Sequence, residues 1–282
     1  MATPRVHIDV DPRNPAEFFA CCGLLEVADR LWGGAEGWFV GQQFCLAAGG
    51  GGALVDLLHA IATCAIRVDR DCRDTGSSGD TNGESPGDLE AGKIAPLRLG
   101  GAPSAFEIRL DWWVAITRRK GKITEAPTAW KLWAGQQSSI MIAATLQQAL
   151  TAQLAICSGS LHSDILRQRQ MLSGRFGFDP GAAWNALDVG FSPNEQGMRV
   201  ATSPAAELLS AVGLQRFVPQ LGATRTFTYC TWGVPLPPTV AKVASAGLMT
   251  AGMARRFRGG VTSRGSYKGL NYSTEIQGDE HA

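Results

Sequence analysis

The chain has 282 residues, of which 45% are apolar and 18% are charged, and its formal net charge is +1. This composition excludes a wholly disordered chain, and the length corresponds to one large domain or two small ones. The longest apolar segment, residues 140–156, is interrupted by three glutamines, so we expect no membrane-spanning helix. The charged N-terminus lacks the apolar core of a signal peptide, which predicts a cytoplasmic protein.

The cysteine pattern is typical of a reduced protein. There are seven cysteines, an odd number, and none has the CxxC or Cys-His spacing that holds zinc. Reduced cysteine behaves as a small apolar side chain. We therefore expect core positions for the cysteines within apolar runs, which are Cys21, Cys22, Cys45, Cys64, Cys157 and Cys230.

The N-terminal segment predicts a strand followed by a helix. Apolar and polar residues alternate over 6–10, as in a half-buried strand. Asn14 is a good N-cap, proline follows it, and Glu17 three residues later completes a capping-box pattern with Asn in place of Ser or Thr. The apolar face then extends to Trp32, and Gly33 ends the helix.

A glycine string connects the next two expected elements, a strand over 43–47 and a helix over 53–64. Strand, glycine-rich loop and helix form the context of a phosphate-binding loop. The spacing of residues 49–52 fits neither GxGxxG nor GxxxxGK[ST], so we interpret the string as a flexible turn.

Residues 67–92 are polar, rich in Gly and Ser, and acidic on balance. Such a segment buries too little apolar area to offset its ordering entropy. We expect a long mobile loop inserted into the domain, and a loop of this length is either functional or disordered.

The rest of the chain mixes strands and helices without regular alternation. The expected elements are a strand over 106–116, helices over 140–157, 163–172 and 203–214, a strand over 224–232 and a helix over 239–253. We find no internal repeat, and the mixture indicates the α+β class. Residues 1–254 are expected to form one domain, followed by a basic and then polar C-terminal tail over 255–282.

Catalytic motifs are missing from the sequence. None of its four histidines lies in a nucleophile motif, and it has neither HExxH nor a Walker lysine. We therefore expect a protein that is not an enzyme, with no metal and no cofactor. The alternative is a cytoplasmic enzyme whose site is assembled from scattered residues such as Asp179, Asp188 or His162.

Basic residues beside aromatic ones are the strongest functional signal. Nucleic acid binding needs cations for the phosphates, aromatic or Arg planes for the bases, and glycines for close backbone approach. One cluster, after Trp112 and Trp113, is Arg118, Arg119, Lys120 and Lys122. A second, interleaved with Phe257, Gly259, Gly260 and Tyr267, is Arg255, Arg256, Arg258, Arg264 and Lys268.

Three further residues are candidates for polar contacts to bases or sugars, namely Lys131, Gln136 and Gln137. The tryptophans around them, at positions 112, 113, 130 and 133, are interpreted as core or interface residues in preference to base platforms. A surface loop and a terminal tail are the alternative explanation for the two basic clusters.

Several longer strings resemble a known family. They are NPAEFFACCGLLEVADRLW, KLWAGQQSS, RFGFDPGAAWNALDVGFSPNEQ, SPAAELLSAVGLQRFVP and YCTWGVPLPP, and the similar region extends from residue 6 to about 246. Together they resemble a family encoded in type I-U (I-G) CRISPR–Cas loci, the locus-specific subunit grouped with the large subunit of the crRNA-guided surveillance complex. None of these strings is a catalytic motif.

This resemblance implies a non-catalytic role in antiviral defence, within a Cascade-like ribonucleoprotein. The implied partners are other CRISPR complex subunits, crRNA, target DNA and a helicase-nuclease that the complex recruits, with no membrane. Guide pairing would supply the sequence choice, and the protein would supply backbone contacts. Because 282 residues are few for a large subunit, a backbone subunit of the RRM-like type is the alternative within the same complex.

Overall fold

The computed structural model describes residues 5–49, 52–69, 93–102, 104–119, 122–133, 137–156, 163–182, 199–249, 255–264 and 267–276. Its N-terminal elements are β1 Val6–Asp9, α1 Pro15–Trp32, β2 Ala35–Val40, β3 Gln43–Ala48, α2 Leu54–Thr63, β4 Ile66–Val68, β5 Leu97–Gly100, β6 Glu107–Leu110, β7 Val114–Arg119 and β8 Lys122–Pro127. Its C-terminal elements are α4 Ser139–Ile156, β9 Gln170–Leu172, β10 Val200–Thr202, α6 Pro204–Phe217, β11 Thr226–Cys230, α7 Pro238–Ser245, β12 Arg256–Arg264, β13 Tyr267–Leu270 and β14 Thr274–Ile276.

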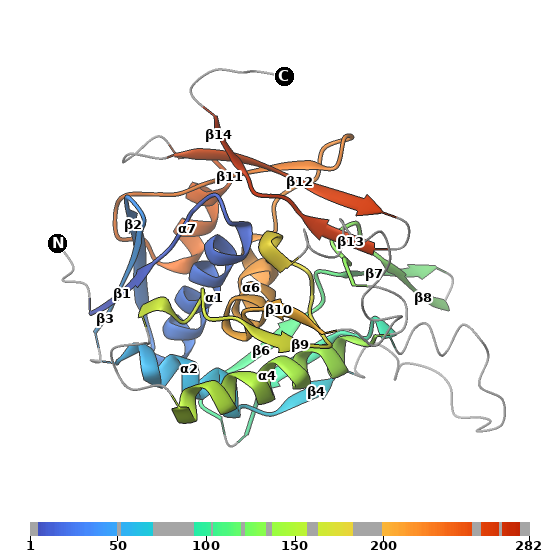
Figure 1. The fold of residues 1–282 in the computed structure, drawn as a ribbon, viewed down its shortest axis with the longest axis horizontal. Helices are drawn as coiled ribbons and strands as arrows, with labels where there is room; N and C mark the ends of the chain where they lie inside the picture. Colours follow the sequence, from blue (N-terminus) through green and yellow to red (C-terminus); the bar gives the residue numbers. More distant parts are fainter. Residues whose placement is uncertain are drawn as a thin grey trace.

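The expected α+β class is confirmed, with small antiparallel sheets arranged around a central helix pair (Figure 1). The sheets are β1-β3-β2, β4-β5-β6, the hairpin β7-β8, the pair β10-β9, and β11-β12-β13 with β14 also on β12. The order β1-β3-β2 makes β1, α1 and β2 a split β-α-β unit. The next strand, β4, pairs with β5, so the sheet departs from the ferredoxin-like pattern at this point.

Helix α1 starts where the sequence predicts. The Asn14 side chain accepts a hydrogen bond from the Ala16 amide, and Gly33 ends the helix with a φ of 69°. The reciprocal capping-box bond is missing, because the Asn14 amide donates to the Asp11 carbonyl. The Glu17 carboxylate instead accepts from the Asp11 amide and the Asn14 side chain.

Helices α1 and α6 are the buried centre of the fold, and they repeat one pattern. Glu17 and Gly23 in α1 correspond to Glu207 and Gly213 in α6, each pair being 190 positions apart (207−17 and 213−23). A Cβ on Gly23 would lie 2.0 Å from the Leu209 carbonyl oxygen, and one on Gly213 would lie 2.0 Å from the equivalent oxygen in α1. The helices therefore cross backbone to backbone at these two glycines.

An ion-pair network closes the end of the same crossing. The buried carboxylate of Glu26 in α1 accepts from Arg30 at 2.7 Å and from the Arg216 Nη2 in α6 at 3.0 Å. Burial alone would raise the pKa of Glu26, but the hydrogen bonds from Arg216 and Arg30 outweigh burial and lower it. The charged form is therefore stabilised by folding.

Glu26→Gln is expected to destabilise the protein at neutral pH by about 1 to 2 kcal/mol, because two arginines lose their shared counter-charge. Since the folded pKa is lowered, this stabilisation is present above the ordinary glutamate pKa and is lost as pH falls through the lowered value. Urea unfolding should show a smaller acid-induced loss of stability in the variant than in the wild type. Glu275→Gln, which removes an exposed partner of Arg255, is the control, and an equal pH dependence in wild type and Glu26→Gln would contradict the prediction.

Several expected strands and helices are shorter than predicted, because a turn interrupts or ends them. The strand over 106–116 is two strands, because the Asp111 carbonyl accepts the Val114 amide in a turn between β6 and β7. The helix over 239–253 ends at Ser245, where Gly247 has a φ of 74°. Residues 163–172 hold a short turn and β9 in place of a helix. The 43–47 strand and the helices over 53–64, 140–157 and 203–214 are confirmed within one to three residues at most ends.

The segment over 255–282 was expected to be an irregular tail, and this expectation is wrong for residues 256–264 and 267–276. They form β12, β13 and β14, and the side chains of Phe257, Val261 and Leu270 are buried. The sheet packs on the segment just before α1. The Tyr229 hydroxyl donates a hydrogen bond to the Pro12 carbonyl, and the Ser273 amide donates one to the Arg13 carbonyl, both at 2.7 Å. The basic residues of this segment are therefore held on a folded sheet.

Helix α4 is the one helix within the described ranges that is long and apolar enough to cross a membrane. It packs against α2 and α6, and 44% of its residues are buried. The expected mobile insertion over 67–92 lies outside the described residues from position 70 on.

Candidate nucleic-acid interface

The outer face of the C-terminal sheet carries the best candidate site. In β12 the buried Phe257, Gly259 and Val261 alternate with Arg256 and Arg258, so the arginines share the opposite face. Because successive strand residues point to opposite faces, Gly260 and Thr262 belong to the same face as these arginines. Figure 1 shows this sheet at one end of the molecule, over the start of α1.

One row of this face combines an arginine with two hydroxyl groups. Cross-strand register places Thr228 of β11 and Thr274 of β14 on either side of Arg258. Both threonines are exposed, and Arg258 is partly exposed. Guanidinium and hydroxyl groups are side-chain types that contact phosphate and sugar oxygens.

Gly260 leaves the next row open. It pairs with Thr226, and a Cβ built on Gly260 would meet nothing within 4 Å. A nucleic-acid strand that lies across Arg258 can thus approach the β12 backbone at this point. We call the surface made by Thr228, Arg256, Arg258, Gly260 and Thr274 the arginine face.

The structure divides the second predicted cluster. Arg256 is exposed and forms no ion pair among the described residues, and its guanidinium passes over Gly247 after α7. Arg255 is neutralised by Glu275 through hydrogen bonds of 2.8 and 2.6 Å. Lys268 pairs with Ser263, so it lies on the opposite face from Arg256 and Arg258.

Base stacking on the aromatics interleaved with this cluster is not supported by the described residues. Phe257, one of the aromatics interleaved with the cluster, is fully buried against Tyr229, with ring centroids 5.5 Å apart. Strand β12 ends at Arg264 and β13 begins at Tyr267, but the side chains of these two residues lie outside the described part of the chain. The arginine face is therefore suited to phosphates and sugars more than to bases.

The first predicted cluster lies on a hairpin. Arg118 and Arg119 end β7 and Lys122 begins β8, with Arg119 opposite Lys122. The side chains of these three residues, and all of Lys120, are outside the described residues. In Figure 1 this hairpin extends to the side of the body, and it belongs to a different sheet from the arginine face.

The tryptophans near this hairpin are core residues, as expected. Trp112 donates its indole N–H to the Ala211 carbonyl at 2.8 Å, and Trp113 donates to Ile94 at 2.9 Å. The buried rings of Trp112, Trp113, Trp130 and Trp133 pack on other aromatic rings. None of the four presents an exposed face to a base.

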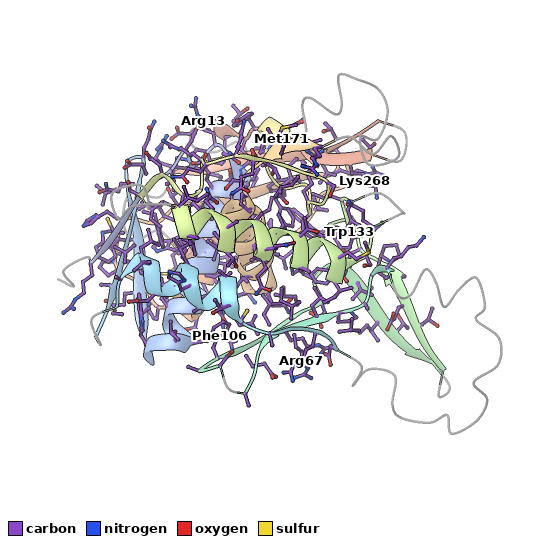
Figure 2. The ribbon with its side chains drawn as sticks, turned by 60° about the horizontal axis from the view of Figure 1, so that its bottom comes forward. Arg13, Arg67, Phe106, Trp133, Met171 and Lys268 are labelled. Atoms are coloured by element: carbon purple, nitrogen blue, oxygen red, sulfur yellow. The ribbon has the colours of Figure 1, made fainter. Side chains whose placement is uncertain are left out.

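The polar candidates after the hairpin have separate places. Lys131 lies over the Trp133 ring, with its Nζ 5.4 Å from the centroid. Gln137 donates to the Ser173 carbonyl at 2.6 Å, so its amide has a structural role. Gln136 is outside the described residues. Figure 2 shows Trp133 near Lys268, and Gly177 lies between Leu132 and the Lys268 carbonyl.

A row of arginines that the sequence analysis missed crosses the β4-β5-β6 sheet. Arg67, Arg98 and Arg109 stand in direct cross-strand register. Three carboxylates neutralise them, because Asp69 binds Arg98 and Arg109, Glu107 binds Arg67 and Arg98, and Asp111 binds Arg109. Like charges in register repel one another. The acids are thus needed to hold the strands together, and we do not assign this row to the interface.

Of the residues named for a scattered enzyme site, only Asp179 lies within the described part of the chain. Asp179 is buried and bound to Arg169 at 3.2 Å and to the Gly181 amide at 3.1 Å. Nearby Glu207 accepts three backbone N–H groups from residues 177–179 at 2.9 to 3.0 Å, and burial raises its pKa. His162 and Asp188 are outside the described residues. Throughout the described ranges, no three His, Cys, Asp or Glu side chains gather to hold a metal.

The glycine string is described only at Gly49 and Gly52, and the start of α2 that follows it already holds a carboxylate. Asp56 in the first turn accepts the Ala53 amide at 2.8 Å, so the protein's own carboxylate occupies the position that an anion would take. Gly52 packs against the indole of Trp32, where a Cβ would fall 1.9 Å from ring atoms.

Comparison with known proteins adds no family. No family model, curated protein or solved structure matches the chain. The site and the residue-level resemblance are thus the observations from which its function is inferred.

Proposed function

We propose that this chain is a non-catalytic nucleic-acid-binding subunit of a type I-U/I-G CRISPR RNA-guided surveillance complex. It contacts the backbone of guide RNA or target DNA and helps to recruit the helicase-nuclease, in the cytoplasm. The observation that carries the proposal is the arginine face, where Arg258 stands between Thr228 and Thr274 in register. The resemblance of the longer sequence strings supplies the particular complex.

Electrostatics explains how such a face would act. With a net charge of +1 the chain has little overall attraction for polyanions, so binding depends on local clusters. A few phosphate contacts give modest affinity, and partners in the complex add the rest. We therefore expect weak binding by the isolated chain and firm retention of RNA in the assembled complex.

The RRM-like backbone subunit remains the second candidate, and one observation favours it. The order β1-β3-β2 with α1 as the crossover is the arrangement that begins a ferredoxin-like sheet. RRM sheets stack bases on exposed aromatics. On the outer side of this sheet His7 and Asp9 are exposed, but Trp38 is buried, so the arginine face remains the better interface.

Co-purification tests the proposed function. We expect a tagged chain, expressed with its neighbouring genes, to elute with partner proteins and a discrete guide-length RNA. RNA retention should decrease as the salt concentration rises, because phosphate contacts release counterions. A partner-free, RNA-free protein that turns over a metabolite would contradict the proposal and support the enzyme alternative.

A further inference from the structure

A hollow at the other end of α1 forms a second candidate site. It has a volume of about 640 Å³ and is lined by the last turn of α1, the start of β2 and the end of β3. The arginine face lies beyond the first turn of this helix. Eighteen residues at about 1.5 Å each separate the two places by roughly 27 Å.

The hollow carries more negative than positive charge. Asp29 and Glu36 line it with Arg5, and among the described residues none of these three forms an ion pair. The C-terminal pole of α1 adds negative potential. An acid in the last turn of a helix opposes that dipole. The Asp29 carboxylate accepts the Ala35 amide at 3.2 Å, and it lies close enough to Arg216 to help raise the pKa of that arginine, but it forms no ion pair among the described residues.

The walls offer an aromatic surface and open space. Trp32 lines the hollow, and Gly52 supports its indole ring. A Cβ on Gly33, Gly34 or Gly49 would meet nothing within 4 Å. Two carboxylates and an indole around an open volume match the requirements of a guanidinium, which is planar, binds carboxylates through several N–H groups and stacks on aromatic rings. A phosphate would be repelled by the same acids.

We propose that this hollow binds the side chain of an arginine presented by a partner protein. The glycines leave room for the main chain that carries the arginine, and the guanidinium lies between Asp29, Glu36 and Trp32. The site goes beyond the proposed nucleic-acid function and does not depend on it.

The test uses calorimetric titration of the full chain with acetyl-Gly-Arg-Gly-amide, in the absence of nucleic acid. We expect saturable binding that Asp29→Asn and Glu36→Gln each weaken by at least about tenfold. Asn at position 29 keeps an oxygen for the Ala35 amide, which the Asp29 carboxylate accepts at 3.2 Å, so the fold is preserved. The indole N–H resonance of Trp32, assigned by Trp32→Phe, should shift on binding.

A matched pair of glycine substitutions locates the site. Gly49→Leu fills the hollow without left-handed backbone strain and should abolish binding. Gly222→Leu adds the same side chain to an exposed turn that does not line the hollow, again without left-handed backbone strain, and should leave binding unchanged. A peptide with citrulline in place of arginine has the same shape without the positive charge. The proposal is overturned if that peptide binds as tightly as the arginine peptide, or if the Gly49→Leu variant binds the arginine peptide as tightly as the wild type does. Agmatine carries a guanidinium group without a peptide main chain. If free agmatine binds more tightly than the peptide, the inference that a partner protein presents the guanidinium is contradicted.

Discussion

Gly23→Ala is expected to destabilise the protein by about 2 kcal/mol or more. The new Cβ would lie 2.0 Å from the Leu209 carbonyl oxygen and 2.9 Å from its carbon. Both atoms belong to the backbone of the facing helix, so no side-chain rotation relieves the overlap. Helices α1 and α6 would have to separate, and the packing of fully buried side chains such as Phe18 and Phe19 between the surrounding layers would loosen.

The intrinsic preference of helices acts in the opposite direction. Alanine is favoured over glycine by about 1 kcal/mol in a helix interior. Overpacking against a fixed backbone costs about 1 to 3 kcal/mol and sometimes more, and here the contact must lengthen towards the 3.4 Å at which ordinary contact begins. We therefore expect the steric term to exceed the helix preference.

Urea unfolding measures this difference, and Gly213→Ala should give a similar loss. Its Cβ would meet the Phe19 carbonyl oxygen at 2.0 Å from the other side of the same crossing. Gly260→Ala is the matched control, because its Cβ meets nothing within 4 Å, and it should change stability by no more than about 0.5 kcal/mol. Wild-type stability in Gly23→Ala would show that the two helices do not cross at these glycines.

This crossing also shows what the sequence could and could not predict. The start and end of α1 were predictable because the caps, Asn14 and Gly33, act on their own neighbours in the chain. The pairing of Gly23 with Gly213 depends on residues 190 positions apart, and no local pattern of apolar residues contains that information. The shared Glu and Gly spacing of the two helices was the available signal.

The C-terminal sheet was missed for a different reason. Glycine is depleted in strands, and the segment is basic and then polar, so it resembled an irregular tail. Its strands are fixed by tertiary contacts, with Phe257 and Val261 buried beneath alternating polar residues. The alternation around Phe257 is a period of two, and that period was the signal that identifies a strand.

The basic candidates were predictable as residue types but not as a surface. Register decides that Arg256 and Arg258 share a face and that Lys268 does not. Pairing decides that Arg255 is neutralised, because its partner Glu275 comes from another strand. Both facts depend on strand pairing, which the sequence alone did not reveal.

Replacing both Arg256 and Arg258 with glutamine is expected to weaken binding of single-stranded RNA by about tenfold or more. Each phosphate contact on a single strand contributes roughly 0.7 to the slope of log K against log salt concentration, so the slope should become shallower by about 1.4. Both side chains lie on the outer face, so glutamine leaves the core below unchanged. Filter binding over a range of salt concentrations measures both quantities.

Arg255→Gln is the matched control for this pair. It removes an arginine from the same strand region, but its guanidinium is already bound to Glu275 through two hydrogen bonds. An ion-paired arginine releases few phosphate counterions, so the slope should change little.

A different outcome would place the interface elsewhere. If the Arg256 and Arg258 variant keeps the wild-type slope while glutamines at 118, 119 and 122 reduce it, the interface belongs to the β7-β8 hairpin. The arginine face would then be a solvated surface, and RNA would contact the protein through the hairpin end.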